Sequence, residues 1–356
     1  AMLGHYSEMF AAMGLDSVPD SQWQFHPLDG YYESVANSLP EVDLTNLYMI
    51  SGSNEPLHRN PEALAVSRNV NSKLHFAEHA PQAGLPVPRT EVYSKRAIRE
   101  GKADRMFSEL PNGVMVKLLG LAGSRNVFAV DSVADCLDQI AEYDDAVQIL
   151  LQQKLDISQW REMTVDLTIT PQDVSISNVR QILFAGGKWV GNYISPELEV
   201  PETHRAVLMK VGAYARDHGH VAEEGINCGI DYFVSGDDVI VTEINARWTG
   251  GLFPAEFLRR LAITQPAVAF FDMVPVAQSE AVRTFQREHL FPAAGDAFAY
   301  VPMGFTPFAM EIEGAERYFV WQIVVGDFAA FVEAKRQKLP EDTFPTAELI
   351  LQEALS

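Results

Sequence analysis

The sequence contains only two cysteines, Cys136 and Cys228, and neither has a histidine beside it in the chain. Two cysteines so far apart exclude a disulfide framework of the kind that stabilises small secreted domains. We expect both to be small buried thiols of a protein from a reducing compartment.

Basic residues are also scarce. The chain has 27 lysines and arginines against 48 aspartates and glutamates, which gives a formal net charge of −21. A field of that sign excludes nucleic acid or an anionic membrane as the main partner. Any phosphate group that the protein binds must therefore be held by local lysines or arginines, by backbone N–H groups or by a metal ion.

Long apolar runs are missing as well. No stretch approaches the roughly 20 apolar residues of a membrane-spanning helix, and the first residues lack the basic-then-apolar order of a signal peptide. We therefore expect a cytoplasmic protein.

What is present is an ordinary globular composition, with 47% apolar and 21% charged residues in 356 positions. This length is sufficient for two or three packed units. Periodicity predicts both helices and strands, with residues 89–200 rich in strands. The predicted helices are 2–13, 62–84, 131–143, 203–219 (with Thr203 as N-cap), 254–261, 327–339 and 346–355; the predicted strands are 44–51, 114–119, 126–130, 147–155, 161–169, 177–185, 188–195 and 318–326.

The most informative stretch is Gly229–Gly251, GIDYFVSGDDVIVTEINARWTGG, which predicts a β-hairpin. Asp231 stands on the first strand, and Glu243 and Asn245 share one face of the second. Three oxygen ligands on a hairpin predict a hard-cation site, with Mg²⁺ as the natural occupant. Asp231 shares the face of Glu243 only if an odd-length loop, such as Gly236–Asp238, closes the hairpin.

A lysine, Lys117, stands on an otherwise apolar strand directly before a loop that contains Gly120, Gly123 and Ser124. A lysine in that setting is costly unless an anion pairs with it. Because the lysine precedes the glycines, this is not a Walker A loop. The loop would cover phosphates as a flap; the alternative is a flexible hairpin with an outward-pointing lysine.

The segment after the hairpin offers a second set of groups for an anion. Gly250 and Gly251 precede a predicted helix, and free N–H groups there suit a phosphate or an oxyanion. Arg180, on the strand that begins at residue 177, is flanked by apolar residues. His218 and His220, near the end of another helix, are interpreted as helix-terminus polar groups rather than metal ligands.

Taken together, these residues resemble the ATP-grasp family. The likeness covers roughly residues 72–275 and is most specific in EINARWTGG. It consists of a lysine before a glycine flap, a strand-to-linker segment at 152–155, G-x-D on one strand and E-x-N-x-R on the next. The segment 72–90 resembles the stretch that carries the first nucleotide-contacting lysine of the family, and Lys73 matches that position.

The resemblance implies a fold of mixed α/β and α+β class, with two α+β subdomains gripping ATP. The implied division is an N-terminal α/β domain at 1–84, a lid subdomain at 85–155, a central subdomain with the Mg²⁺ site at 156–275 and a C-terminal α+β extension at 276–356. It also implies ATP and Mg²⁺ as cofactors, and a reaction in which a carboxylate takes the γ-phosphoryl group before an amine displaces phosphate.

The resemblance further implies a role for each matching residue. Arg180 and Arg247 would act in catalysis and hold the substrate, together with Gly250 and Gly251. The residues implied for nucleotide binding are Lys73, Lys117, Gly120, Gly123, Ser124, the linker residues Gln153, Lys154 and Leu155, and Glu162; Asp156 is an alternative to Glu162 for the ribose. Those implied for the metal are Asp231, Glu243 and Asn245.

The flanking regions look like the pheganomycin-type peptide ligases of specialised metabolism. That likeness implies small-molecule partners, an amino acid or peptide carboxylate and an amine, and allows a homodimer. Three other interpretations stay open: a ligase that closes a lactam within one substrate, a phosphotransferase that stops at phosphate transfer, and a nucleotide-binding regulator without turnover.

Overall fold

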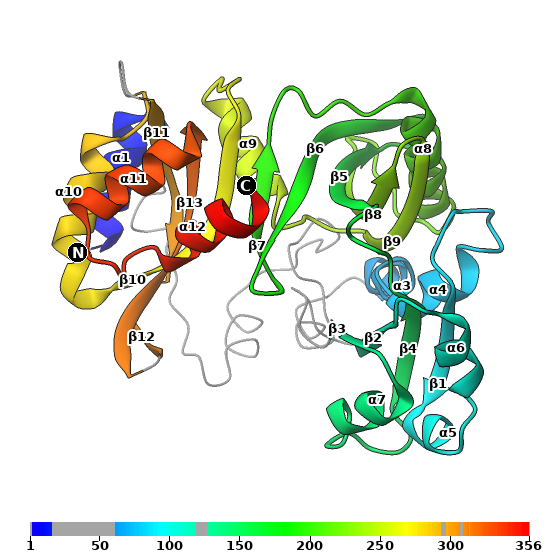
Figure 1. Cartoon of the computed structure of the whole chain (residues 1–356). Coiled ribbons are helices and arrows are strands. Elements are labelled where there is room, and N and C mark those ends of the chain that lie inside the picture. The colour runs from blue at the N-terminus through cyan, green and yellow to red at the C-terminus, as the bar shows by residue number, and fades with distance from the viewer. Residues whose placement is uncertain are drawn as a thin grey trace. The chain divides into compact units, whose positions relative to one another are not determined.

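The structure is a computed structural model that describes residues 2–15, 61–118, 127–292, 297–306, 309–312 and 314–355. The chain forms two compact units (Figure 1). The first unit comprises residues 1–25, 180–199 and 250–356, and the second comprises 26–179 and 200–249. Within the described residues, no helix is both long enough and apolar enough to cross a membrane.

One part of the second unit is a four-stranded antiparallel sheet of order β1-β4-β2-β3. Its strands are β1 (Thr90–Ser94), β2 (Val114–Leu118), β3 (Val127–Val130) and β4 (Gln148–Gln153). Three short helices, α5 (Lys95–Arg99), α6 (Asp104–Glu109) and α7 (Val133–Gln139), accompany it. They bury Ile98, Met106 and Cys136 against alternate strand residues such as Val116 and Leu151.

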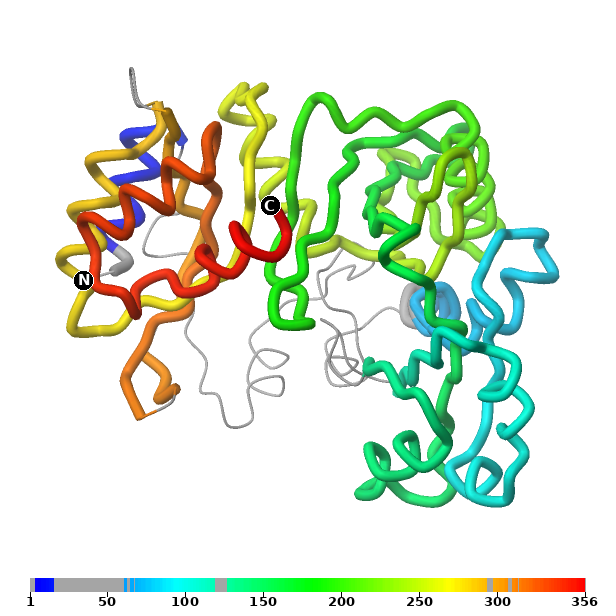
Figure 2. The backbone as a smooth tube through the Cα atoms, viewed as in Figure 1, coloured from blue at the N-terminus to red at the C-terminus, as the bar shows by residue number. Residues whose placement is uncertain are grey.

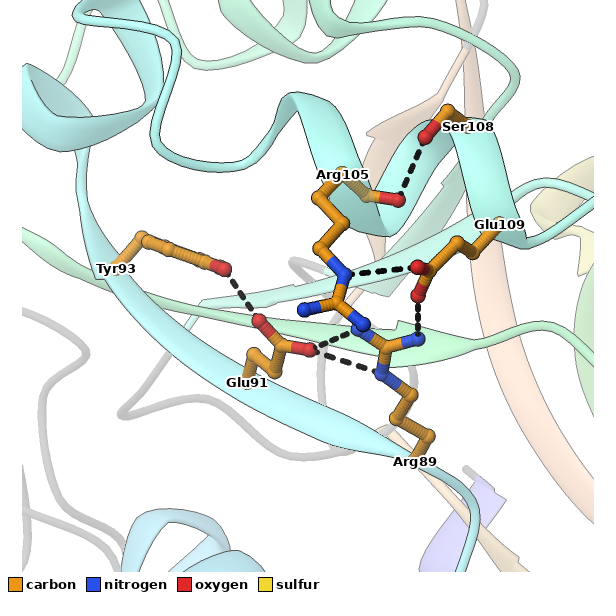
Figure 3. A network of polar contacts seen from close by, with 6 residues as sticks. All are labelled: Arg89, Glu91, Tyr93, Arg105, Ser108 and Glu109. Atoms are coloured by element: carbon orange, nitrogen blue, oxygen red, sulfur yellow. Dashed lines mark hydrogen bonds and ion pairs between the residues drawn. The ribbon is translucent and has the colours of Figure 1, made fainter.

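A polar network joins β1 to α6 on this sheet (Figure 3). The guanidinium of Arg89 donates to Glu91 and, at 2.6 Å, to Glu109, while the Tyr93 hydroxyl donates to the other oxygen of Glu91. Arg105 also donates to Glu109, at 2.7 Å. These groups are largely exposed, so the network fixes side-chain positions more than it stabilises the fold.

The other part of the second unit consists of α3 (Pro61–Val70), α4 (Lys73–His79), α8 (Glu202–Asp217) and three antiparallel strands. The strands β5 (Arg161–Ile169), β8 (Ile226–Ser235) and β9 (Asp238–Asn245) pair in that order. The helix α8 lies against all three strands and buries Leu208 and Val211. The strand β6 (Val174–Ala185) runs across the boundary between the two units.

Two details of these helices differ from the sequence predictions. The predicted helix 62–84 is two helices, because the Ser72 side chain accepts from His75 N–H and caps a new start at Lys73. Thr203 does not cap α8; the N-cap is Pro201, and the Thr203 hydroxyl donates to Asp237 instead. The Ser72 cap is a local contact three residues long, whereas Asp237, the partner of Thr203, is 34 positions away and could not be predicted from local sequence.

The first unit gathers three distant stretches of the chain (Figure 2). Its strands are β7 (Lys188–Ile194), β10 (Ala267–Pro275), β11 (Phe298–Phe305), β12 (Met310–Ile312) and β13 (Ala315–Gly326). They pair in the order β11-β13-β10-β7, with β12 on β13. The end of β6 continues into β7 through the predicted turn at Gly186 and Gly187.

Both faces of this sheet are packed by helices. Alternate residues such as Phe270 and Val324 face α10 (Ser279–Glu288), α11 (Phe328–Lys338) and α12 (Pro345–Leu349), which a short π-helical turn, Ile350–Ala354, extends. The opposite alternation, including Ala269 and Ile323, packs on α9 (Leu252–Arg260) and the end of α1 (Met2–Ala12). The predicted helices at both termini are therefore confirmed, and they pack on opposite faces of the same sheet.

Candidate active site

The predicted hairpin is present, and it brings Asp231 directly opposite Glu243. The turn contains two residues, because Ser235 pairs with Asp238 around the left-handed Gly236. The predicted odd-length loop is therefore wrong. A bulge beside Asp231 leaves Thr242 as the extra residue on β9, and this shifts the register so that Asp231 and Glu243 share a face.

The same face extends onto β5. Thr164 pairs with Asp231, and Asp166 pairs with Gly229, which pairs in turn with Asn245. Glu162, Thr164 and Asp166 alternate with apolar residues along β5, so their side chains share one face, and Thr164 and Asp166 are buried there. They belong to a polar cluster on this face, which we call the polar floor: Glu162, Thr164, Asp166, Asp231, Glu243 and Asn245.

The two central carboxylates of the polar floor interact strongly. Burial raises the pKa of the Asp231 carboxyl to about 6, and the charge of Glu243 adds to this rise. Burial opposes ionisation of Glu243 too, but Lys73 and Lys117 outweigh it and lower the pKa of that carboxyl. Asn245 donates from Nδ2 to Asp231 Oδ2 at 3.1 Å. The two lysines therefore stabilise the ionised form of Glu243, which is the anionic member of the pair.

Both predicted nucleotide lysines reach the polar floor. Lys73 Nζ lies 2.5 Å from Glu243 Oε2, and Lys117 Nζ lies 3.4 Å from the carbonyl oxygen of Thr242. Burial lowers the pKa of Lys117 to about 8, helped by the charge of Lys73 and opposed by the carboxylates. The alternative of an outward-pointing Lys117 is therefore wrong, since the side chain is 8% exposed.

Glu162, predicted as a ribose ligand, stands on the polar floor. Burial raises the pKa of its carboxyl to about 8, the charge of Asp231 adds to the rise, and Lys117 opposes it. Three acidic groups and two lysines thus share one partly buried face. The perturbed pKa values of Glu162, Asp231, Glu243 and Lys117 on this face are typical of functional sites.

Arg247 follows the hairpin and is fixed by residues that the sequence did not single out. Its Nη1 donates to Asn71 Oδ1 at 3.2 Å, and Asn71 Nδ2 donates to the carbonyl oxygen of Ala246 at 3.1 Å. The charge of Arg247 opposes the rise in the pKa of Asp231 and adds to the lowering of the pKa of Glu243. The asparagine that ends α3 therefore positions the arginine beside the polar floor.

Asp166 holds the segment that carries Arg247. Its Oδ1 accepts from Asn227 Nδ2 at 2.9 Å and from the Thr249 hydroxyl at 3.0 Å. Asn227 Nδ2 also donates to the carbonyl oxygen of Arg247 at 2.8 Å. The alternation of β5 contained the signal for this role, because a wholly buried carboxylate needs several donors to compensate for its burial.

Replacing Asp166 with alanine is expected to destabilise the protein by about 3 kcal/mol, because Asn227 and Thr249 lose a buried acceptor. Chemical denaturation would measure the change. The matched control is Asp173→Ala at an exposed turn on the same unit, which should change stability by less than about 0.5 kcal/mol. Equal effects of the two replacements would contradict the assigned role of Asp166.

The remaining predicted residues are distributed as follows. Gln153 N–H donates to the carbonyl oxygen of Arg89 at 2.8 Å, Lys154 N–H approaches that of Gly113 at 3.4 Å, and Leu155 is buried. These residues form the link between β4 and β5, and their adenine contacts stay a prediction. Gly120, Gly123 and Ser124 lie outside the described residues.

Arg180, Gly250 and Gly251 belong to the first unit. The Arg180 side chain is fully buried. A Cβ at Gly251 would lie 2.3 Å from Arg180 Nε, so no larger residue fits there without moving the guanidinium. The sequence paired these residues as substrate ligands, and the structure brings Arg180 and Gly251 into contact.

The polar floor fits a divalent cation by the chemistry of its donors. Two carboxylates and an amide are hard oxygen ligands, and a bound cation would relieve the repulsion that raises the Asp231 pKa. The described residues contain no group of three His, Cys, Asp or Glu side chains arranged to hold a metal ion. The proposed set therefore depends on the Asn245 side-chain oxygen as its third ligand.

Comparison with known proteins finds no matching family model and no matching curated protein. Solved structures do match. Phosphoribosylamine–glycine ligase from Thermotoga maritima gives a TM-score of 0.54 at 16% identity, over 98% of this chain and 93% of that one. Carboxyaminoimidazole ribonucleotide synthase from Aspergillus clavatus, complexed with ATP, gives 0.52 at 15% identity, over 75% and 70%.

A third structure, N5-carboxyaminoimidazole synthetase from Staphylococcus aureus with ADP, gives a TM-score of 0.51 at 11% identity, over 79% of this chain and 74% of that one. At sequence identities this low, the matches are evidence for the fold alone. The expected fold is confirmed by these matches.

Proposed function

We propose that this chain, which has the ATP-grasp fold, is an ATP-dependent ligase that joins a small carboxylate to an amine. The observation that carries the proposal is the convergence of Lys73 and Lys117 on the carboxylates of the polar floor. Two cations and a pair of hard oxygen ligands on one partly buried face suit a polyphosphate and its metal ion. The structural neighbours that contain ATP or ADP support the same interpretation.

In the proposed reaction, a substrate carboxylate oxygen attacks the γ-phosphorus of ATP and ADP leaves. The amine then attacks the acyl carbon, phosphate leaves, and an amide and a proton are produced. Mg²⁺, held by Asp231, Glu243 and Asn245, would neutralise charge on the phosphates. Lys73 and Lys117 would bind phosphate oxygens, so most of the catalysis is positioning and charge neutralisation.

Two further roles belong to the arginines. Arg247, held by Asn71, presents a guanidinium from the end of the hairpin, and Arg180 presents one from β6. Either could stabilise the acyl phosphate or the oxyanion of the tetrahedral intermediate. No residue is assigned as a general base, because an amine can arrive deprotonated or use a carboxylate of the substrate.

More specifically, we propose an amino acid or peptide ligase of the pheganomycin type, in which Gln153–Leu155 would contact the adenine of ATP. The flanking sequence supports this proposal. The domain boundaries at 84, 155 and 275 and a homodimeric state are proposed on the same basis.

The function is tested by screening pairs of amino acids with ATP and Mg²⁺ and measuring phosphate and ADP. Both products should appear only when a carboxylate and an amine are supplied together, and chelation of the metal with EDTA should abolish their release. Release of AMP would contradict the ligase mechanism. A phosphorylated substrate without free phosphate would instead identify a phosphotransferase.

A further inference from the structure

Three histidine rings gather where α4 meets α8. His75 and His79, one turn apart on α4, stack with their ring centroids 4.0 Å apart and their planes 14° apart. His218, which caps the end of α8, contacts His75 edge-on at 5.2 Å. Tyr214, one turn earlier on α8, contacts the His218 ring at 4.2 Å. We call His75, His79 and His218 the histidine cluster, and the proposed function uses none of them.

Hydrogen bonds fix where two of these rings carry their proton. A carbonyl oxygen can only accept, so His79 Nδ1 donates to the carbonyl oxygen of His75 at 2.9 Å, and His218 Nδ1 donates to that of Tyr214 at 2.8 Å. The Tyr214 hydroxyl lies 3.3 Å from His75 Nδ1. A further proton on His79 or His218 must therefore enter at Nε2 and make the ring a cation. Two stacked cations this close repel each other, because Coulomb repulsion grows as the separation falls.

The central ring already favours its neutral form. Burial lowers the pKa of the His75 imidazole, the charges of His79 and His218 lower it further, and the charge of Glu78 opposes them. The folded chain therefore binds fewer protons at this position than the unfolded chain. The resulting contribution to stability is complete above the ordinary histidine pKa of 6.5 and is lost as the pH falls through the lowered value.

The other charges near α4 do not change in the same sense. The helix also packs on α3, β1 and β9. The remaining ionisable side chains on these elements and on the near end of α8 are Glu62, Arg68, Glu91, Tyr93, Lys210, Arg216, Asp217, Asp238 and Glu243. Glu91 is bonded to Tyr93, and Glu243 is paired with Lys73. The histidines are therefore the groups at the contact of α4 with α8 that gain charge as the pH falls below neutrality.

The same helix carries Lys73 to the polar floor. It is seven residues long, and a helix this short depends on tertiary contacts for its stability. The residue that it buries, Phe76, packs edge-on against Tyr214 with ring centroids 5.8 Å apart. His75 is only two residues after Lys73, whose Nζ lies 2.5 Å from Glu243. Moving His75 away from α8 therefore moves Lys73 away from Glu243.

We propose that the histidine cluster is an acid-sensitive contact that controls whether Lys73 reaches the polar floor. With neutral rings, α4 is held against α8 and Lys73 lies at the phosphate site. Protonation of a second ring repels α4 from α8 and withdraws Lys73. This inference rests on the proposed function and names a regulation of that site, in which nucleotide is bound near neutral pH and released in acid.

Hydrogen exchange of the full chain without ATP, followed by mass spectrometry, tests the contact directly. In the wild type, the protection of residues 72–80, corrected for intrinsic exchange rates, should fall about tenfold between about pH 8 and about pH 5.5, because two imidazolium charges repel at this distance. The double variant His79→Asn with His218→Asn keeps a donor for each carbonyl oxygen but cannot become charged. Its protection should change less than about twofold over the same range.

The matched control is His289→Asn, which removes a histidine at the end of α10 in the first unit and should keep the wild-type response. His75→Gln, which removes the central ring alone, is a second test variant and should also lose most of the response. Circular dichroism near pH 8 checks that each variant is folded. An undiminished loss of protection in both test variants would overturn the proposal, since the carboxylates of the polar floor, which both retain, would then be its cause.

A separate calorimetric titration with Mg²⁺ and a non-hydrolysable ATP analogue tests the connection to Lys73. Between the same two pH values, the wild type should lose about tenfold more affinity than the double variant. Protonation of the nucleotide and of Asp231 affects both chains alike, so the difference between them reports the histidines. Equal losses would overturn the connection to Lys73. Absence of nucleotide binding at either pH would refute the proposed function, and the exchange experiment would still decide whether the histidine cluster responds to acid.

Discussion

Replacing Glu243 with glutamine is expected to lower ATP-dependent phosphate release about a thousandfold while the fold survives. Glu243 is the carboxylate that Lys73 and Lys117 keep anionic, and it lies opposite Asp231. A glutamine of the same shape loses the charge that would hold the metal ion, which contributes several kcal/mol to phosphoryl transfer. The measurement is the rate of phosphate release at saturating ATP and Mg²⁺, with circular dichroism as the check on folding.

The control for this variant is Glu224→Gln, which changes the same atoms at an exposed position of the same unit. It should keep the wild-type rate. Because the pKa of Glu243 is lowered in the folded protein, its charge is net stabilising there, and Glu243→Gln should be modestly less stable than the wild type while it remains folded. Wild-type activity in Glu243→Gln would contradict the metal assignment.

Replacing Gly229, which pairs with Asp166 and Asn245 of the polar floor, with alanine is expected to be strongly damaging for so small a substitution. The added Cβ would lie 2.1 Å from Thr249 Cγ2, 3.2 Å from Asp166 Oδ1 and 3.4 Å from Asn245 Cβ. The segment that carries Arg247 and Thr249 must therefore shift to relieve these contacts. Overpacking of this kind costs about 1–3 kcal/mol or more, and we expect a lowered midpoint in urea together with weakened turnover.

A second substitution tests whether the clash with Thr249 causes the destabilisation of Gly229→Ala. Thr249→Ser removes Cγ2, the atom in closest conflict, and keeps the hydroxyl that donates to Asp166. The double variant Gly229→Ala with Thr249→Ser should recover much of the stability lost by Gly229→Ala alone. If the two substitutions are additive, the clash with Thr249 is not the reason that this position is a glycine.

The sequence was most informative where the chemistry was local. Asp231, Glu243 and Asn245 were identified from strand alternation, because a carboxylate on an otherwise apolar strand is conspicuous. The pairing register of the two hairpin strands was harder to predict. A two-residue turn was expected to separate Asp231 from Glu243, and only the bulge at Thr242 joins them; bulges have no reliable signature in a single sequence.

Contacts between distant residues could not be predicted. Asp166 was one of four polar residues on an alternating strand, and only the fold shows that Asn227 and Thr249 share its carboxylate. The first helix gave no sign that its His5 would bond to Gln286, 281 positions away. Such pairings depend on how strands assemble into a sheet, which local periodicity does not encode.

The measurement that tests the central claim most directly is calorimetric titration of the protein with a non-hydrolysable ATP analogue, with Mg²⁺ and with EDTA. The account predicts one equivalent bound with Mg²⁺, at least tenfold weaker binding in EDTA, and loss of this Mg²⁺ dependence in Glu243→Gln. Binding that is equal with and without the metal, or unchanged in that variant, would contradict the assignment of the polar floor as the metal and phosphate site.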